Sequence, residues 1–322
     1  MSGLKPLRFQ PIYHSRIWGG RHLESLFGRH LPDANPYGES WELCDRPEAQ
    51  SVVQDGPLAG LTLHDLWTDR RVEIFGARHR DHPASRFPIL LKILDCHDVL
   101  SLQVHPPAAI APALGGEPKT EMWYVAHATE KALIYAGLRH GASREKFEAA
   151  LIHGTAADLV HRITPREGEF MMVESGRIHA LGAGLVVFEI QQNSDTTYRV
   201  FDWNRTGLDG KPRALHVAES MSCIDFDDFE PALGSPKPDG AMVECPFFAT
   251  SFHSIASGKR SDFKLPDDDF ACIAVVRGSG SLANERVGAG DFVLLPAGSN
   301  PWHLATDSAQ MEWLEIRLPM PG

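Results

Sequence analysis

The stretch that decides the fold runs from Gly176 to Trp203 and reads GRIHALGAGLVVFEIQQNSDTTYRVFDW. Residues 185–191 are rich in β-branched and apolar side chains, which predicts a strand. Residues 193–195 (Asn-Ser-Asp) supply turn chemistry. Residues 196–203 are then predicted to form the returning strand of a hairpin.

Polar side chains are predicted to gather on one side of this hairpin, because side chains alternate between the two faces of a strand. Glu189 and Gln191 share one face of the first strand, and Thr197 and Arg199 share a face of the second. The opposite face of the first strand carries Val186, Phe188 and Ile190. His179 lies just upstream, beside glycines that let the backbone turn tightly. The hairpin is therefore a candidate for a functional site.

Length and charge limit the class of protein. The chain has 322 residues, enough for two domains or for one large and one small domain. Its formal net charge of -11 argues against nucleic acid as a general partner. An anionic ligand would therefore need local Lys and Arg residues.

Cysteines and apolar runs point to a compartment. The five cysteines are scattered and form no Cys-x-x-Cys pair, so we expect reduced thiols in a cytoplasmic protein. The first residues contain no apolar run of signal-peptide length. No window reaches the roughly 20 apolar residues of a membrane span, so no membrane partner is expected.

The remaining pattern is mainly that of strands, with a few helices. Phe87 to Leu94 is an apolar run interrupted only by Pro88 and Lys92, which indicates a buried strand. Thr62 is predicted to cap a helix that runs to Phe75 and stops at Gly76. Residues 143–163 are predicted to be a helical insertion of two segments, with Ser143 capping the first and Thr155 and Asp158 forming a capping box for the second. A short helix is predicted over residues 213–221.

A weak internal repeat suggests two related β units. Gly-acid-Phe occurs at residues 168–170 and again at 290–292, and each copy is followed by a second Gly and then by His179 or His303. With a linker at 235–240, we predict a catalytic domain of residues 1–235, with the helical insertion at 143–163, and a smaller C-terminal domain of residues 236–322. Residues 274–282 offer no His or Glu as a partner for His303. The second unit is therefore expected to be structural, without a metal site.

The candidate metal ligands are Gln103, His105, Glu121 and His179. In extended chain Gln103 and His105 face the same way, and so do Lys119 and Glu121. Zinc suits imidazole nitrogen and carboxylate oxygen. Spacing alone leaves a structural reading open, because the chain has 16 histidines and His105 could simply end a strand before a proline.

Several motifs together resemble one family. In chain order they are IWGG at 17–20, GESW at 38–41, QVHP at 103–106, KTEMWY at 119–124, GRIHAL at 176–181, EIQQNSDTTYRVFDW at 189–203 and GDFVLLPA at 290–297. The chain resembles the type I mannose-6-phosphate isomerase family over nearly its whole length, and in order and spacing it best resembles the short bacterial members.

The resemblance implies a mainly β fold of cupin-type jelly-roll β-barrels with one zinc ion per chain. It implies that Gln103, His105, Glu121 and His179 are the zinc ligands. Arg199 falls on the active-site arginine of the family, Glu189 on an acidic residue close to it, and Lys119 on a lysine that lines the substrate pocket. The chain departs from the family at Pro107, Ala108 and Pro118, which alters loop shape near the metal.

The implied reaction is the zinc-dependent interconversion of mannose 6-phosphate and fructose 6-phosphate through an enediol(ate). Arg199 would stabilise the enediolate or hold the phosphate, and Lys119 would be a second cation for the phosphate. The base is left open between Glu189 and a metal-bound water. Two alternatives remain at this stage. One is a non-catalytic cupin that binds a sugar or sugar phosphate, and the other is an isomerase of a related sugar. Neither the oligomeric state nor the pathway is encoded in the pattern.

Overall fold

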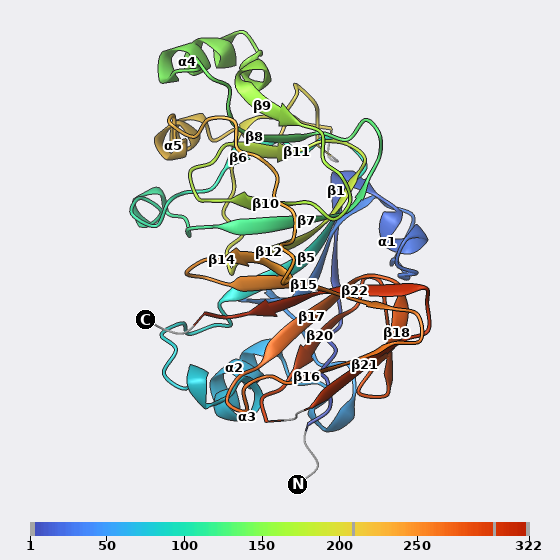
Figure 1. Ribbon diagram of the computed structural model, residues 1–322. Helices are drawn as coiled ribbons and strands as arrows, with labels where there is room; N and C mark the ends of the chain where they lie inside the picture. The colour runs from blue at the N-terminus through green and yellow to red at the C-terminus, as the bar shows by residue number, and fades with distance from the viewer. Residues whose placement is uncertain (1–3, 208–209, 299–300, 320–322) are drawn as a thin grey trace.

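The computed structural model describes residues 4–207, 210–298 and 301–319 and is built mainly from antiparallel strands (Figure 1). The helices are α1 (His22–Ser25), α2 (Leu63–Asp69), α3 (Arg71–Phe75), α4 (Arg144–Ile152) and α5 (Val217–Cys223), with short 3-10 turns at Gly56–Leu58, Ala77–His79, Pro112–Leu114 and Ala156–Leu159. The strands of the first part of the chain are β1 (Ile12–Gly20), β2 (Tyr37–Leu43), β3 (Asp45–Arg46), β4 (Ala49–Gln50), β5 (Ile89–Cys96), β6 (Leu102–Val104), β7 (Glu121–Ala128), β8 (Ile134–Leu138), β9 (Val160–Ile163), β10 (Phe170–Val173), β11 (His179–Leu181), β12 (Leu185–Gln192) and β13 (Tyr198–Phe201). Those of the second part are β14 (Ala241–Glu244), β15 (Ala249–Ala256), β16 (Arg260–Phe263), β17 (Ala271–Arg277), β18 (Ser279–Leu282), β19 (Glu285–Gly288), β20 (Phe292–Leu295), β21 (Trp302–Thr306) and β22 (Gln310–Arg317).

The strands form two units of the same plan. The first unit has sheets of order β1-β2-β5-β12-β7-β10 and β13-β6-β11-β8-β9. The second has sheets of order β14-β15-β22-β17-β20 and β16-β21-β18-β19, and the chain visits equivalent positions in the same sequence. This confirms the predicted pair of related jelly-roll β units. The repeated Gly-acid-Phe motif leads into equivalent edge strands, β10 and β20.

The two units share one hydrophobic core. Val186, Phe188 and Ile190 on the outer face of β12 belong to the same buried cluster as Leu314 and Ile316 of β22. Figure 1 shows β15, β22 and β17 of the second unit lying against the six-stranded sheet of the first. Because alternate residues of β12 are committed to this core, its other residues must face the interior of the first unit.

The predicted hairpin over residues 185–203 is wrong, although both of its strands exist. β12 lies in the six-stranded sheet, whereas β13 lies in the opposite sheet and pairs with β6. The connection between the two strands does not form a tight turn, because side-chain hydrogen bonds fix it to other segments of the chain. The Asn193 Nδ2 donates hydrogen bonds to the carbonyls of Asp45 (2.7 Å) and Phe87 (3.0 Å). The chain therefore crosses between sheets, and the polar groups of the two strands face each other across the barrel.

The helices differ from the predictions in detail. Thr62 caps α2 in a capping box with Asp65, as expected, but the backbone breaks at Arg70 and a second helix, α3, follows. In the insertion Ser143 caps α4, as predicted. Thr155 makes no side-chain cap, and a 3-10 turn and strand β9 follow it instead of a second α-helix.

The predicted helix at 213–221 is shifted. α5 runs over Val217–Cys223, so residues 213–216 lie in an irregular connection before it. No helix in the described part of the chain has the length and apolar composition needed to cross a bilayer.

Candidate active site and metal centre

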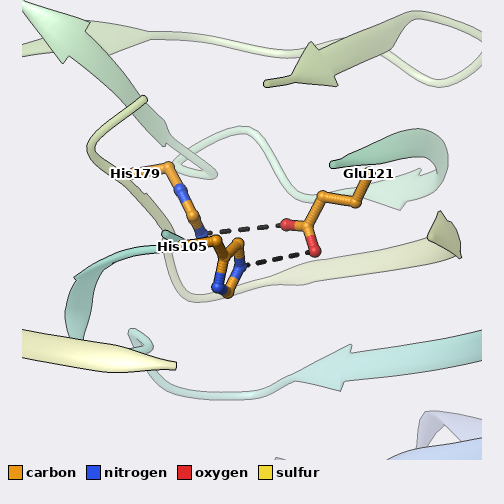
Figure 2. Close-up of side chains that lie close together, drawn as sticks. All are labelled: His105, Glu121 and His179. Atoms are coloured by element: carbon orange, nitrogen blue, oxygen red, sulfur yellow. Dashed lines mark ion pairs between the residues drawn. The ribbon is translucent and has the colours of Figure 1, made fainter. Parts of the chain in front are cut away.

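Three buried side chains of the predicted ligand set lie together inside the first unit. Figure 2 shows His105 and His179 pointing at the two carboxylate oxygens of Glu121. The Nε2 of His105 is 3.5 Å from Glu121 Oε2, and the Nε2 of His179 is 3.7 Å from Glu121 Oε1. All three side chains are completely buried. One donor atom from each lies within 4.8 Å of the others, a spacing at which three groups can hold one metal ion.

Each imidazole is oriented by the backbone. His105 Nδ1 is 2.9 Å from the carbonyl of Thr196, and His179 Nδ1 is 2.9 Å from the carbonyl of Arg177. A carbonyl can only accept, so Nδ1 carries the proton in both rings. Nε2 is then unprotonated in both rings and directed into the cluster, which is the arrangement of metal-binding histidines.

Gln103 completes the set. It lies directly opposite His179 in the β6–β11 pairing, and its side-chain amide is 3.2 Å from His179 Nε2. Amide oxygen and nitrogen are exchanged by a simple flip, so the oxygen can face the same point as the two imidazoles. The structure thus brings together all four predicted ligands.

The electrostatics of the cluster fit a cation. Burial, and then the neighbouring His105, lower the pKa of His179 to about 3. Burial would raise the pKa of Glu121, but Lys119 and the two histidines hold it well below its usual range. His105 Nε2 is buried with no hydrogen-bond partner among the described residues, and both Glu121 oxygens are buried, with the Lys119 ammonium as an ion-pair partner of Oε2 at 2.8 Å. Buried polar atoms are rarely left unsatisfied, so two neutral imidazoles around an ionised carboxylate suit a divalent metal such as zinc.

Arg199 is placed beside this cluster by strand pairing. In the five-stranded sheet Arg199 of β13 pairs with Gln103 of β6, and Gln103 in turn pairs with His179 of β11. These three residues form a row across neighbouring strands about 5 Å apart. Burial, and then the charge of Arg213, lower the pKa of the Arg199 guanidinium, which nevertheless stays charged because an arginine pKa is so high.

A cavity of about 410 Å³ opens beside the metal cluster, and Gln103, Lys119, Glu189 and Arg199 all line it. Thr197 does so too, so the predicted shared face of Thr197 and Arg199 is confirmed. A cavity of this size suits a small ligand such as a sugar phosphate.

Glu189 faces the cavity from β12, opposite β13. Its Oε2 accepts a hydrogen bond of 3.0 Å from the indole nitrogen of Trp123, and its Oε1 lies 3.6 Å from the ammonium groups of both Lys119 and Lys92. Burial and the negative charge of Glu121 raise the pKa of Glu189, and the two lysines oppose that rise. A buried carboxylate with a raised pKa is a reasonable proton acceptor near neutral pH.

Lys119 sits between two carboxylates. Its Nζ is 2.8 Å from Glu121 Oε2 and 3.6 Å from Glu189 Oε1, and the side chain is buried. Although burial would lower the pKa of Lys119, the two carboxylates raise it above the usual value. The lysine is therefore charged, and it balances charge at the metal end of the cavity.

Sequence reasoning missed several charged residues that line the cavity: Arg16, Glu39, Lys92, Asp195 and Arg213. One of them, Lys92, could have been recognised from the sequence. Lys92 interrupts an otherwise apolar strand, and a charge in a buried strand needs a partner. In the structure Lys92 is only 3% exposed and is held by three carboxylates. Glu39 and Asp195 lie within motifs of the family resemblance, although they were not singled out as site residues, and no local pattern separated Arg16 and Arg213 from surface charges.

The second unit carries a reduced version of the same arrangement. His303 pairs with Asp262 in the β16–β21 register, just as His179 pairs with Gln103, and their side chains are 2.7 Å apart. The expectation that His303 lacks a partner is therefore wrong, because the partner comes from β16 and not from 274–282. Both side chains are substantially exposed. By strand register, Ala271 occupies the position that Glu121 has in the first unit.

Comparison with known proteins gives a consistent picture. Residues 7–115 match the family described as "Phosphomannose isomerase type I, catalytic domain". The mannose-6-phosphate isomerase of Streptococcus mutans is 34% identical over 315 residues, which cover 94% of this chain and 96% of the relative. A mannose-6-phosphate isomerase of Bacillus subtilis is 34% identical over 317 residues, covering 93% and 96%.

Solved structures of mannose 6-phosphate isomerases share the fold of this chain. The crystal structure of the mannose 6-phosphate isomerase from Bacillus subtilis superimposes with a TM-score of 0.86 at 30% identity, covering 98% of this chain and 100% of that one. A putative mannosephosphate isomerase from Archaeoglobus fulgidus shares the fold, with a TM-score of 0.79 at 21% identity over 99% of both chains.

Proposed function

This chain belongs to the type I mannose-6-phosphate isomerase family, and on that premise we propose that it interconverts mannose 6-phosphate and fructose 6-phosphate with one zinc ion bound per chain. The observation that carries the proposal is the buried cluster of His105, Glu121 and His179, in which His105 Nε2 has no partner among the described residues, next to a cavity lined by Gln103, Lys119 and Arg199. Gln103, His105, Glu121 and His179 would hold the zinc.

The reaction needs a base and a source of positive charge. A proton must move between C2 and C1 of the sugar, and negative charge develops on the oxygens of the enediolate. Zinc, when bound, supplies Lewis acidity toward the sugar oxygens. The remaining requirements fall to side chains of this chain that line the same cavity.

Glu189 is our candidate for the proton-transfer residue. It is buried, faces the cavity, and is held by Trp123 through one oxygen, which leaves Oε1 directed toward the lysines and the cavity. A fixed carboxylate with a raised pKa can accept a proton from carbon and return it to the neighbouring carbon. A water molecule is the other candidate, and the variant Glu189→Gln separates the two.

Arg199 and Lys119 are assigned to charge stabilisation. The row Arg199–Gln103–His179 supports a role for Arg199 at the reacting end of the sugar, where a preorganised cation stabilises developing negative charge. Lys119 forms ion pairs with Glu121 and Glu189. These contacts support a role in balancing the charge of the two carboxylates more than a role in binding the phosphate group.

The partner in this proposal is a small sugar phosphate, with no role for nucleic acid or membrane. A cytoplasmic location is part of the proposal, because all five cysteines are free thiols.

A coupled assay of mannose 6-phosphate isomerisation tests the function. The purified protein is assayed as isolated, after chelation, and after zinc is returned. We expect activity to disappear with the chelator and to return with zinc. A zinc-loaded protein that binds mannose 6-phosphate without turning it over would instead indicate a sugar-phosphate-binding cupin, and turnover of only a different sugar would indicate a shifted specificity.

A further inference from the structure

The charges that line the cavity are not distributed evenly. Five cationic and three acidic side chains line it, although the chain as a whole carries a net charge of -11. The acidic groups are concentrated around the lysines. Lys92 lies 3.5 Å from Glu39, 3.6 Å from Glu189 and 3.8 Å from Asp195, and Lys119 also contacts Glu189. The positive charge of the lysines is therefore compensated by the protein itself.

The positive charge of the arginines near the cavity is less fully balanced by carboxylates. Arg213 and Arg205 share one carboxylate, that of Asp202, at 2.6 Å from Arg213 Nε and 3.0 Å from Arg205 Nη2. Arg199 donates through Nη1 to the carbonyl of Ala214, and its buried Nε has no hydrogen-bond partner among the described residues. Three guanidinium groups thus lie near the Asp202 carboxylate, and of the three only Arg205 has a second carboxylate, Asp98, at 3.3 Å.

Arg16 reaches the same cavity from the other sheet. Its Nε donates to Glu39 Oε1 at 2.6 Å, but Glu39 also accepts from the Trp41 indole and lies 3.5 Å from Lys92. Burial would raise the pKa of Glu39, yet the charges of Lys92 and Arg16 hold it below its usual range. Glu39 is therefore shared between Arg16 and Lys92, and Arg16 keeps N–H donors beyond this pair, since its Nη1 reaches only the carbonyl of Ser15 at 3.4 Å and its Nη2 has no partner among the described residues.

Guanidinium groups from two walls, with spare N–H donors, form a binding site for an anion. Each guanidinium has five donors in a planar fork that matches a phosphate group. Arg199 is tied by strand pairing to Gln103, next to the metal cluster. Arg213 follows β13 in the connection to α5, and Arg16 comes from β1, so neither is held in this row.

We propose that Arg16 and Arg213 form the subsite that binds the phosphate group of the substrate, which leaves Arg199 free to act at the reacting carbons. The inference rests on the proposed function, because the phosphate is carried on C6, at the opposite end of the sugar from C1 and C2. It assigns selectivity for phosphorylated over neutral sugar to two residues outside the metal ligands and the proton-transfer machinery.

The test compares Arg213→Gln and Arg16→Gln with the matched control Arg205→Gln. Arg205 contacts the same Asp202 as Arg213, but it does not line the cavity. The loss of a charge-assisted hydrogen bond predicts that KM for mannose 6-phosphate rises about 10- to 100-fold in each cavity variant. We expect kcat to change less than about threefold, because an interaction made equally in ground and transition states affects only binding. Zinc content should stay unchanged.

A second measurement is independent of turnover. Trp18 and Trp123 line the cavity, so titration of the zinc-loaded protein with inorganic phosphate is followed by tryptophan fluorescence. We expect binding in the wild-type protein and in Arg205→Gln, and about 10-fold or greater weakening in the two cavity variants.

The outcomes distinguish failure of the phosphate subsite from failure of the isomerase assignment. Wild-type KM in both cavity variants, or an equal effect of Arg205→Gln, overturns the phosphate subsite while the isomerase assignment stands. Phosphate binding that depends on Arg213 in a protein without isomerase activity supports the subsite and counts against the proposed reaction.

Discussion

Substitution of His179 by alanine is the sharpest test of the metal centre. The side chain is fully buried, its Nδ1 is fixed by the Arg177 carbonyl, and its Nε2 is 3.7 Å from Glu121. The alanine variant keeps His105 and Glu121 but loses one oriented lone pair. Loss of an outer-shell partner alone costs about 10- to 100-fold in metal affinity, so loss of a ligand should cost more than about 100-fold.

The size of the effect can be estimated from linkage. Zinc at about 100 times its dissociation constant stabilises the folded protein by about 2.7 kcal/mol. For a chain of 322 residues, with an unfolding entropy of about 2.1 cal/mol/K per residue, this corresponds to a rise in Tm of roughly 4 °C. In His179→Ala the same zinc concentration should give a rise of less than about 1 °C, because binding more than about 100-fold weaker leaves at least about half of the sites empty.

The assay is a thermal melt of each variant with and without zinc, together with metal analysis of the purified protein. Comparing the zinc-induced shift within each variant removes the separate cost of losing the His179 ring, which packs 5.3 Å from Trp123. His303→Ala is the matched control, since it removes the equivalent histidine of the second unit and should keep the full shift. One equivalent of zinc and an undiminished shift in His179→Ala would refute the ligand assignment.

Three further predictions test other parts of the structure. Arg199→Ala should lower kcat at least about 100-fold with zinc content unchanged, since it removes a cation beside the reacting carbons; full activity in this variant would exclude Arg199 from the mechanism. Glu189→Gln should abolish exchange of the substrate C2 proton with solvent, measured by NMR, while mannose 6-phosphate still binds; exchange at the wild-type rate would favour a water as the base. Asp269→Asn should lower the free energy of unfolding by about 1–3 kcal/mol at neutral pH. Burial would raise the pKa of Asp269, but His79 and Arg317 lower it below the ordinary 3.8. A lowered carboxyl pKa contributes stability above the unfolded-state value and loses it as the pH falls through the folded-state value. The difference between Asp269→Asn and wild type in urea unfolding should therefore shrink below about pH 3.8, and a difference independent of pH would contradict this account.

The C-terminal unit has a physical role in shaping the site. Val186, Phe188 and Ile190 on the outer face of β12 are buried against the sheet of the second unit, where Phe188 and Phe292 lie 5.3 Å apart. This packing fixes the direction of β12 and therefore turns Glu189 into the cavity. The second unit lacks a carboxylate at the position of Glu121, because Ala271 stands there.

Local pattern was enough to predict much of the site. The alternation along residues 185–191 correctly assigned Glu189 to the face opposite Phe188, because the two-residue period of a strand is a property of the backbone itself. The same reasoning placed Gln103 with His105, and the family motifs pointed to His179. The capping of α2 by Thr62 was also visible in the sequence, since a cap depends on residues within one turn.

Only the tertiary structure decided which strands face one another. The sequence contained β12 and β13 but suggested a hairpin, whereas the anchored turn at Asn193 sends β13 into the opposite sheet beside Gln103. Arg16 and Arg213 are nearly 200 positions apart, and nothing in either neighbourhood signals that they share a cavity. The physical reason is that side-chain alternation is set by neighbours in the chain. The pairing of distant strands, and the charge balance of the cavity between them, depend on contacts that form only when the barrel closes.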